Sequence, residues 1–188
     1  MKELTLAQIA EACGGTLIGG NEAKEYTVTG VEIDSRRVKA GDLFVAIPGE
    51  KVDGHIFIPD VLNKGAYALS QQSLDVDGAY ILVEDTVTAM KRLARFYRST
   101  LDIKVVGITG SVGKTSTKEM IASVLDTKFR VHKTQGNFNN GIGLPLTIFQ
   151  IEKEHQVAVL EMGISEFGEM HELADMAQPD IMVITLSL

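Results

Sequence analysis

The sequence predicts an α/β protein in two parts: a small α/β domain at residues 1–82, then a parallel-sheet domain at residues 83–188. Short strand-like runs between loops rich in Gly and Asp indicate the first domain. Longer apolar runs that alternate with helical patterns after Lys104 indicate the second. Of the 188 residues, 45% are hydrophobic and 23% are charged, which is typical of a globular protein with an ordinary core.

The first helix is expected directly after Thr5. This residue is a typical N-cap, and Gln8 completes a capping box three positions later. The apolar face that follows consists of Leu6, Ile9, Ala10 and Cys13. Gly14 is expected to end the helix. Cys13 is the single cysteine, so no internal disulfide can form, and its position favours a small core residue over a reactive thiol.

The rest of the first domain is predicted as short strands around one short helix. Strands are expected at 16–18, 26–31, 43–47, 67–70 and 80–83, and a helix at 59–64 that Gly65 ends. A helix at 86–98 leads into the second domain, and its cations are Lys91, Arg92, Arg95 and Arg98. We expect a solvated face near the helix C-terminus, with an anion-binding patch as the alternative.

The second domain is predicted as a doubly wound parallel sheet. Strands are expected at 105–109, near 131, at 157–160 and at 181–184. The helix after the first strand is expected to bury Met120, Ile121, Val124 and Leu125, and a later helix to bury Phe167, Met170, Leu173 and Ala174. Ligands of such sheets bind at the carboxyl ends of the strands.

A Gly-rich turn between the first strand of this sheet and its helix has the layout of a phosphate-binding loop. Gly110 and Gly113 let the backbone curl around an anion, and the helix start points its N–H groups at the same place. Lys114 adds a positive charge, and the Thr115 hydroxyl suits magnesium. Ile108 stands where the usual motif has its first glycine, so an ordinary strand–turn–helix corner remains the alternative.

Two further segments of this domain carry polar chemistry. Glu161 ends the strand at 157–160, where phosphate-loop proteins place a carboxylate near magnesium; the alternative is a glutamate merely exposed at a strand end. The loop at 134–145 holds Asn137, Asn139 and Asn140, whose amides suit a polar ligand but are also common turn formers.

Two segments of the first domain also stand out, Asp34-Ser35-Arg36 and the run from Gly49 to His55. Arg36 is able to bind a phosphate with two parallel hydrogen bonds, and His55 is able to act as a base or a ligand contact. Both segments read equally well as surface turns.

The net charge of −7 argues against non-specific nucleic-acid binding. No apolar run approaches the ~20 residues that span a bilayer, and the N-terminus lacks the apolar segment of a signal peptide.

Together these segments resemble the Mur ligases, the ATP-dependent ligases of peptidoglycan synthesis. The run from Thr109 to Thr115 matches their loop, and so does Gly107, which stands one position before the usual first glycine. Residues 34–36 and 53–55 resemble their UDP-sugar-binding first domain. The segments 136–140 and 142–145 resemble the member that adds D-alanyl-D-alanine. Gly141 departs from the pattern, where an acidic residue is expected, and so does the tail at 186–188, where an Asn and a His are expected.

The resemblance implies a bacterial, cytoplasmic, monomeric enzyme that uses ATP and Mg²⁺, binds no nucleic acid and does not insert into a membrane. It would activate UDP-N-acetylmuramoyl-tripeptide as an acyl phosphate and join D-alanyl-D-alanine to it. Lys114 and Glu161 would be catalytic, with Thr115 and Glu161 at the metal. The nucleotide would contact Gly107, Ile108, Thr109, Gly110, Ser111, Val112, Gly113, Lys114, Thr115, Ser116, Asn137, Asn139 and Asn140. The UDP-sugar would contact Ser35, Arg36, Asp53, Gly54 and His55.

Members of this family have three domains and about twice this length. The resemblance therefore implies a first domain plus an incomplete central ATP-binding domain at 83–188, without the C-terminal domain, so we expect little or no ligase turnover from the chain alone. Three alternatives stay open. They are a sibling ligase that adds the third amino acid, a small phosphate-loop kinase, and a non-catalytic fragment that only binds UDP-sugar or nucleotide.

Overall fold

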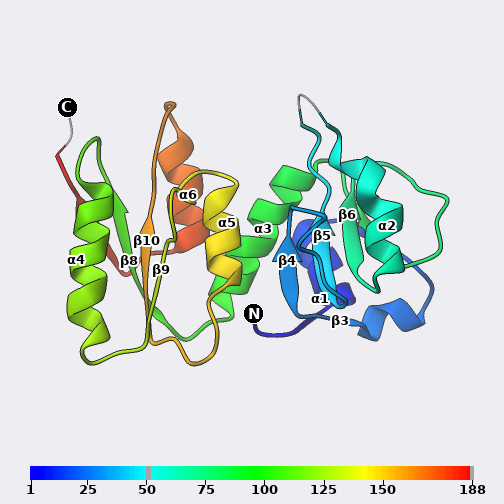
Figure 1. Ribbon diagram of the computed structural model, residues 1–188, viewed down its shortest axis with the longest axis horizontal. Helices are drawn as coiled ribbons and strands as arrows, with labels where there is room; N and C mark the ends of the chain where they lie inside the picture. Colours follow the sequence, from blue (N-terminus) through cyan, green and yellow to red (C-terminus); the bar gives the residue numbers. More distant parts are fainter. Residues whose placement is uncertain (50–51, 187–188) are drawn as a thin grey trace. The chain divides into compact units, whose positions relative to one another are not determined.

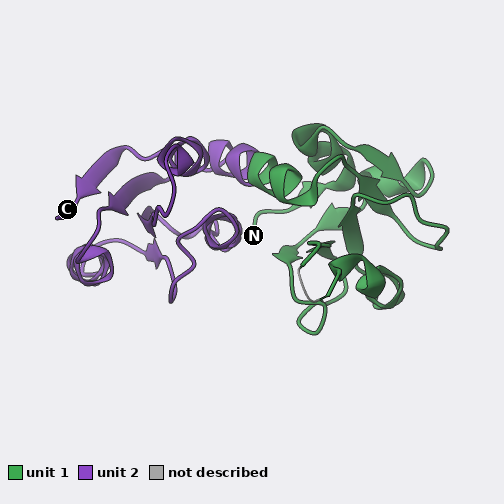
Figure 2. Ribbon diagram, turned by 90° about the horizontal axis from the view of Figure 1, so that it is seen from above, with its two compact units in different colours: residues 1–93 green, residues 94–188 purple. Residues whose placement is uncertain are grey.

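The computed structural model describes residues 1–49 and 52–186 and divides into two compact units, 1–93 and 94–188 (Figures 1 and 2). The units divide within helix α3 (Thr86–Ser99), whereas the sequence predicts a boundary at residues 82/83. Glu50 and Lys51, in one of the segments singled out above, and Ser187 and Leu188 of the tail lie outside the described residues.

The first unit is built on a mixed sheet with the strand order β2-β7-β6-β5-β4. All neighbours are parallel except β2 and β7. The elements before α3 are β1 (Leu4–Thr5), α1 (Leu6–Cys13), β2 (Thr16–Ile18), η1 (Glu22–Glu25), β3 (Thr27–Val28), β4 (Gly30–Glu32), β5 (Asp42–Val45), η2 (Gly54–Phe57), α2 (Ile58–Asn63), β6 (Tyr67–Ser70) and β7 (Tyr80–Leu82). The strand predicted at 26–31 is two strands, because β3 pairs with β1 whereas β4 pairs with β5.

The first helix confirms its sequence signals. Thr5 and Gln8 form both hydrogen bonds of the capping box, and Gly14 ends α1 in the left-handed conformation. Cys13 is buried, and burial raises the pKa of its thiol to about 12. The thiol is therefore a protonated core group, as its place on the apolar face predicts.

The second unit is a parallel sheet in the order β11-β8-β10-β9, with helices on both faces (Figure 1). After α3 its elements are β8 (Lys104–Thr109), α4 (Lys114–Asp126), β9 (Val131–Lys133), α5 (Gly143–Phe149), β10 (Val157–Glu161), α6 (Glu169–Ala177) and β11 (Ile181–Ile184). Helix α4 packs on one face, and α5 and α6 lie on the other (Figure 1). Strand β10 is buried along its whole length, as the apolar run predicts for a central strand.

The predicted buried stripe of α4 is wrong at two positions. Met120 and Val124 are each 70% exposed, whereas Lys118 and Ala122 are buried. Helical spacing alone fits either face here, and the ion pair that Lys118 makes with Glu161 selects the face that turns inward. The predicted burial of Phe167 is also wrong, because this residue is exposed and lies before the start of α6.

The solvated face predicted for α3 is wrong at Arg98. This side chain is buried and donates hydrogen bonds to the carbonyls of Ala177, Gln178, Leu101 and Ile103. Its guanidinium also lies 3.8 Å from Asp180, which accepts a hydrogen bond from the Val105 N–H. The arginine therefore ties the turns before β8 and β11 together. Five donors in a rigid fork suit this task.

His132 on β9 gives the fold a dependence on acid. Its ring is buried, its Nε2 lies 3.0 Å from the Thr147 carbonyl, and the His155 ring is 5.1 Å away. Burial, together with the charge of His155, lowers its pKa from 6.5 to about 4. The unfolded chain therefore binds the extra proton first as the pH falls below 6.5, and stability is lost.

We expect the free energy of unfolding to fall by about 3 kcal/mol between pH 7 and pH 4 from this group. Urea denaturation at pH 7, 6, 5 and 4 measures it. His132→Gln should remove much of this pH dependence, while the exposed His171→Gln should keep it. Identical pH profiles for His132→Gln and the wild-type chain would contradict this account.

A candidate nucleotide site at the carboxyl edge of the parallel sheet

The Gly-rich turn forms the loop that the sequence predicts, between β8 and α4. Gly110 has φ +132° and Gly113 has φ +85°, which are conformations that favour glycine. A Cβ added at Gly113 would meet nothing within 4 Å, so the backbone here is open to a ligand. The first-turn N–H groups of α4 have no acceptor within the helix. An open turn with N–H groups at a helix start fits an anion such as a phosphate.

The start of the loop is held by the chain that follows β11. Thr185 donates to the Thr109 carbonyl through both its N–H, at 2.8 Å, and its hydroxyl, at 3.0 Å. The Ser111 N–H donates to the Leu186 carbonyl at 2.9 Å. Among the described residues, the Thr109 hydroxyl is the buried side-chain group that has no hydrogen-bond partner. An unpaired buried hydroxyl next to the loop is consistent with a polar ligand there.

Gly110 supplies a direct test of this geometry. A Cβ at this position would lie 2.2 Å from the Thr185 hydroxyl and 3.0 Å from the Thr185 backbone. We expect Gly110→Ala to lower the free energy of unfolding by about 2–4 kcal/mol, since both the space and the positive φ oppose it. Gly113→Ala should cost only about 1 kcal/mol, because only the backbone conformation opposes it. Urea denaturation compares the two, and equal losses would contradict the assigned contact.

Three predicted members of the loop, Gly107, Ile108 and Thr109, lie within strand β8 instead. Gly107 pairs with Leu160 and Met182 across the sheet, and a Cβ there would meet Met162 and Met182 at 2.5 and 2.7 Å. Ile108 is fully buried in the core beneath α4. Gly107, the offset glycine, therefore lets the neighbouring strands and side chains pack closely. Neither Gly107 nor the side chain of Ile108 faces the interior of the loop.

Glu161 and Thr115 come together as predicted for a metal-binding pair. The Thr115 hydroxyl donates to Glu161 Oε2 at 3.0 Å. Asn139 donates its amide to Glu161 Oε1 at 2.9 Å, and the Glu161 N–H donates to the Thr134 hydroxyl at 2.9 Å. Glu161 is 2% exposed, so the carboxylate is held in one orientation. The exposed strand-end alternative is therefore wrong.

These oxygen atoms have the right chemistry for magnesium. A hydroxyl and a carboxylate are hard donors, and Mg²⁺ commonly takes one or two protein oxygens together with phosphate oxygens and water. Within residues 1–49 and 52–186 no cluster of three His, Cys, Asp or Glu side chains has metal-binding geometry. The Thr115 hydroxyl and the Glu161 carboxylate therefore fit a Mg²⁺ that also takes phosphate oxygens and water.

The asparagine-rich segment serves two purposes. Asn140 Oδ1 accepts from the N–H groups of Ile142 and Gly143 and so starts α5, a buried helix that the sequence analysis did not identify. Asn139 instead reaches Glu161, and the Asn137 carbonyl accepts the Asn139 N–H. The turn-forming interpretation applies to Asn140, whereas contact of Asn137 and Asn139 with a ligand stays a prediction.

Lys114 lies at the start of α4, and its ammonium donates to the Gly110 carbonyl at 2.7 Å. Lys118, which the sequence analysis missed, lies one turn further and is buried 3.6 Å from Glu161 Oε2. The signal was available, since residues three apart on a helix share a face and Thr115 and Lys118 have this spacing.

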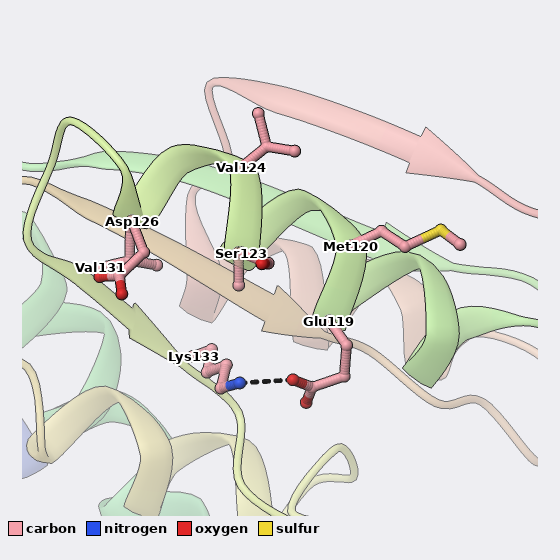
Figure 3. Close-up of a pocket in the computed structure, with 8 residues that line it drawn as sticks. Glu119, Met120, Ser123, Val124, Asp126, Val131 and Lys133 are labelled. Carbon is pink, nitrogen blue, oxygen red and sulfur yellow. Dashed lines mark hydrogen bonds and ion pairs between the residues drawn. The ribbon is translucent and has the colours of Figure 1, made fainter.

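A separate cavity of about 710 Å³ lies between α4 and β9, where Lys133 pairs with Glu119 (Figure 3).

The first unit places Ser35 and Arg36 in a cavity of about 480 Å³. Its remaining lining residues are Phe57, Asp60, Asn63 and Lys64. Arg36 binds Asp34 through two hydrogen bonds of 2.8 and 2.6 Å, and these hold the pKa of Asp34 at about 2. Lys64, which the sequence analysis missed, donates to the Ser35 carbonyl at 2.8 Å and fixes the loop.

The second segment of the first unit is held by its own hydrogen bonds. His55 is buried, with Nδ1 2.6 Å from Asp53 and Nε2 accepting the Gln71 N–H at 3.0 Å. Hydrogen bonds from His55 lower the pKa of Asp53. A Cβ on Gly54 would lie 2.9 Å from the Ile47 backbone. His55 is therefore not an exposed surface-turn residue, because its buried ring binds this segment to Gln71 after the end of β6.

No helix in the described part of the chain is long and apolar enough to cross a membrane.

A model of the Mur ligase middle domain matches residues 108–186, and a model described as Mur ligase family, catalytic domain, matches residues 27–98. Both matches fall on the segments built above.

Relatives and solved structures agree with these matches. The chain is 45% identical to UDP-N-acetylmuramoyl-tripeptide–D-alanyl-D-alanine ligase of Bacillus subtilis (strain 168), over 98% of this chain and 41% of that protein. The enzyme of the same name from Escherichia coli (strain K12) is 36% identical, over 98% and 40%. The chain thus spans about two fifths of the length of these curated relatives.

Among solved structures, MurF from Acinetobacter baumannii superposes with a TM-score of 0.89 at 33% identity, over 98% of this chain and 41% of that one. The MurF ligase from Thermotoga maritima in complex with ADP gives 0.77 at 38% identity, over 85% and 38%. The two family models, the relatives and the shared fold lead to one conclusion: the chain belongs to the Mur ligase family.

Proposed function

We propose that this chain is the UDP-sugar- and ATP-binding part of a ligase that joins D-alanyl-D-alanine to UDP-N-acetylmuramoyl-tripeptide. The contact that carries the proposal is the one between Thr115 and Glu161 beside the open turn at Gly113. The printed names of the relatives, at 36% to 45% identity over 98% of this chain, supply the substrates. The domain limits proposed are 1–82 for the UDP-sugar and 83–188 for ATP.

The proposed reaction has two steps. The terminal carboxylate of the UDP-linked tripeptide takes the γ-phosphoryl group of ATP, which gives an acyl phosphate and ADP. The amine of D-alanyl-D-alanine then attacks the acyl carbon, phosphate leaves with the bonding electron pair, and the amine loses a proton as the amide forms. No protein nucleophile is required, so the protein acts by holding two anionic reactants together and offsetting their charge.

The residues of this chain have separate parts in that work. The N–H groups at the start of α4 bind phosphate oxygens, and Lys114 neutralises charge on the transferred group. Thr115 and Glu161 would hold Mg²⁺, which would supply positive charge to neutralise the phosphates. Asn139 keeps the Glu161 carboxylate in place through its 2.9 Å hydrogen bond. In the first unit, the cavity with Ser35 and Arg36 receives the UDP-sugar.

The proposal extends to the setting of the enzyme. We propose that the protein acts in the bacterial cytoplasm, as a monomer, on diffusible precursors of peptidoglycan. The net charge of −7 agrees with small-molecule substrates and not with nucleic acid.

Calorimetric titration with UDP-N-acetylmuramoyl-tripeptide tests the first-unit assignment. We expect one site per chain, and about tenfold weaker binding for Arg36→Ala because a charged hydrogen-bond donor is lost. Arg37→Ala is the matched control. Arg37 is the exposed neighbour of Arg36 in sequence, but it pairs with Glu32 and does not line the cavity. A chain that releases no heat with the UDP-sugar would overturn the assignment.

A further inference from the structure

Lys118 is a buried cation that the proposed chemistry does not use. It lies on α4, one helical turn after Thr115, and its side chain is 2% exposed. Its ammonium lies 3.6 Å from Glu161 Oε2 and 3.4 Å from Glu119 Oε1. The same oxygen of Glu161 accepts the Thr115 hydroxyl at 3.0 Å. The fold therefore buries a positive charge against Glu161 Oε2, the oxygen that also accepts the hydroxyl of Thr115.

The burial of both charges explains why the pair must stay together. Glu161 is 2% exposed and Lys118 is 1% exposed, so water solvates neither group well. A buried carboxylate without a cation is strongly disfavoured, and removal of one partner leaves the other uncompensated. Asn139 supplies a neutral hydrogen bond to the other carboxylate oxygen, which orients Glu161 but does not balance its charge.

We propose that Lys118 is a positioning residue that balances the charge of Glu161 when no divalent cation is bound, and so weakens the dependence of nucleotide binding on Mg²⁺. This inference rests on the proposed nucleotide site. Without Lys118, the bare carboxylate repels the phosphates of the nucleotide across a poorly solvated space. A divalent cation between the two anions removes that repulsion, so only the metal-free complex suffers from the loss of the lysine.

The neighbouring pair provides a matched control. Glu119, the second partner of Lys118, also pairs with Lys133 of β9 at the wall of the cavity between α4 and β9 (Figure 3). Lys133→Met removes a cation from the same glutamate, because the ammonium of Lys133 pairs with Glu119. This variant therefore reports what loss of a lysine near α4 does on its own.

The test is calorimetric titration with ADP in excess Mg²⁺ and in EDTA. For Lys118→Met we expect the metal-free affinity to fall by about tenfold and the affinity in Mg²⁺ to change little, so the coupling between metal and nucleotide rises by about tenfold. The double variant Lys118→Met/Glu161→Gln should recover the metal-free affinity, because the repelling charge is gone. Lys133→Met should keep the wild-type coupling.

The other outcomes separate the role of Lys118 from the nucleotide site itself. An equal loss with and without Mg²⁺, or a double variant that shows no recovery, would overturn the role of Lys118 and leave the nucleotide site standing. A wild-type chain that does not bind ADP in Mg²⁺ would overturn the proposed site and this inference with it. If Lys118→Met is unfolded in EDTA, recovery of its thermal transition by MgCl₂ supports charge balance, and no recovery overturns it.

Discussion

Replacing Lys114 with alanine is expected to weaken binding of a magnesium–ATP analogue by about 10- to 100-fold. A charge-assisted hydrogen bond contributes about 1.5–3 kcal/mol, and each 1.4 kcal/mol is a factor of ten in affinity. The lysine follows the open turn at Gly113, and its ammonium already lies in the loop, 2.7 Å from the Gly110 carbonyl. Calorimetric titration gives the two affinities directly.

The same variant should leave UDP-sugar binding nearly unchanged, because the candidate UDP-sugar cavity is lined by residues of the other unit. Lys128→Ala is the control for loss of a lysine from this unit, since that side chain lies over the Phe129 ring after α4 has ended. A Lys114→Ala variant with wild-type nucleotide affinity would remove the lysine from the proposed mechanism.

The largest effect on stability is expected from Arg98→Ala, which should lower the free energy of unfolding of the second unit by about 3–5 kcal/mol. The guanidinium is buried and donates to four backbone carbonyls, those of Ala177, Leu101, Ile103 and Gln178. Its loss leaves those four carbonyls without these donors, whereas Asp180 keeps the Lys104 ammonium and the Val105 N–H. Urea denaturation followed by circular dichroism measures the change.

Arg95 offers a control on the same helix. It pairs with Asp175 at the surface, with 59% of its side chain exposed, so Arg95→Ala should cost less than about 1 kcal/mol. Arg98→Lys should recover only part of the loss, because an ammonium cannot reproduce the planar fork. Similar losses for Arg95→Ala and Arg98→Ala would show that the buried hydrogen bonds contribute little.

Much of the fold is predictable from local chemistry. The capping box at Thr5, the glycine stop at Gly14 and the apolar run of β10 each depend on neighbours in sequence, and each prediction is confirmed. The errors arise where tertiary partners decide. Lys118 turns inward because Glu161 receives it, and Arg98 turns inward because carbonyls 79 and 80 residues away accept its hydrogen bonds.

The candidate site divides in the same way. The loop at 110–115 is visible in the sequence because glycine, lysine and threonine have strong individual reasons to be there. Asn139 and Asn140 look alike in sequence, yet one orients Glu161 and the other starts α5, because only the folded backbone determines what each amide reaches. The contact of His55 with Gln71 was likewise invisible, since sixteen residues separate them, although its other partner, Asp53, is only two residues away.

The most direct test of the central claim is an NMR titration of the ¹⁵N-labelled chain with magnesium–ADP. The account predicts that the backbone amide signals of Gly110, Gly113, Lys114 and Thr115 shift first and saturate together, with those of the first unit little changed. A titration in which these four signals stay fixed up to millimolar nucleotide would contradict the claim that this loop is a nucleotide site.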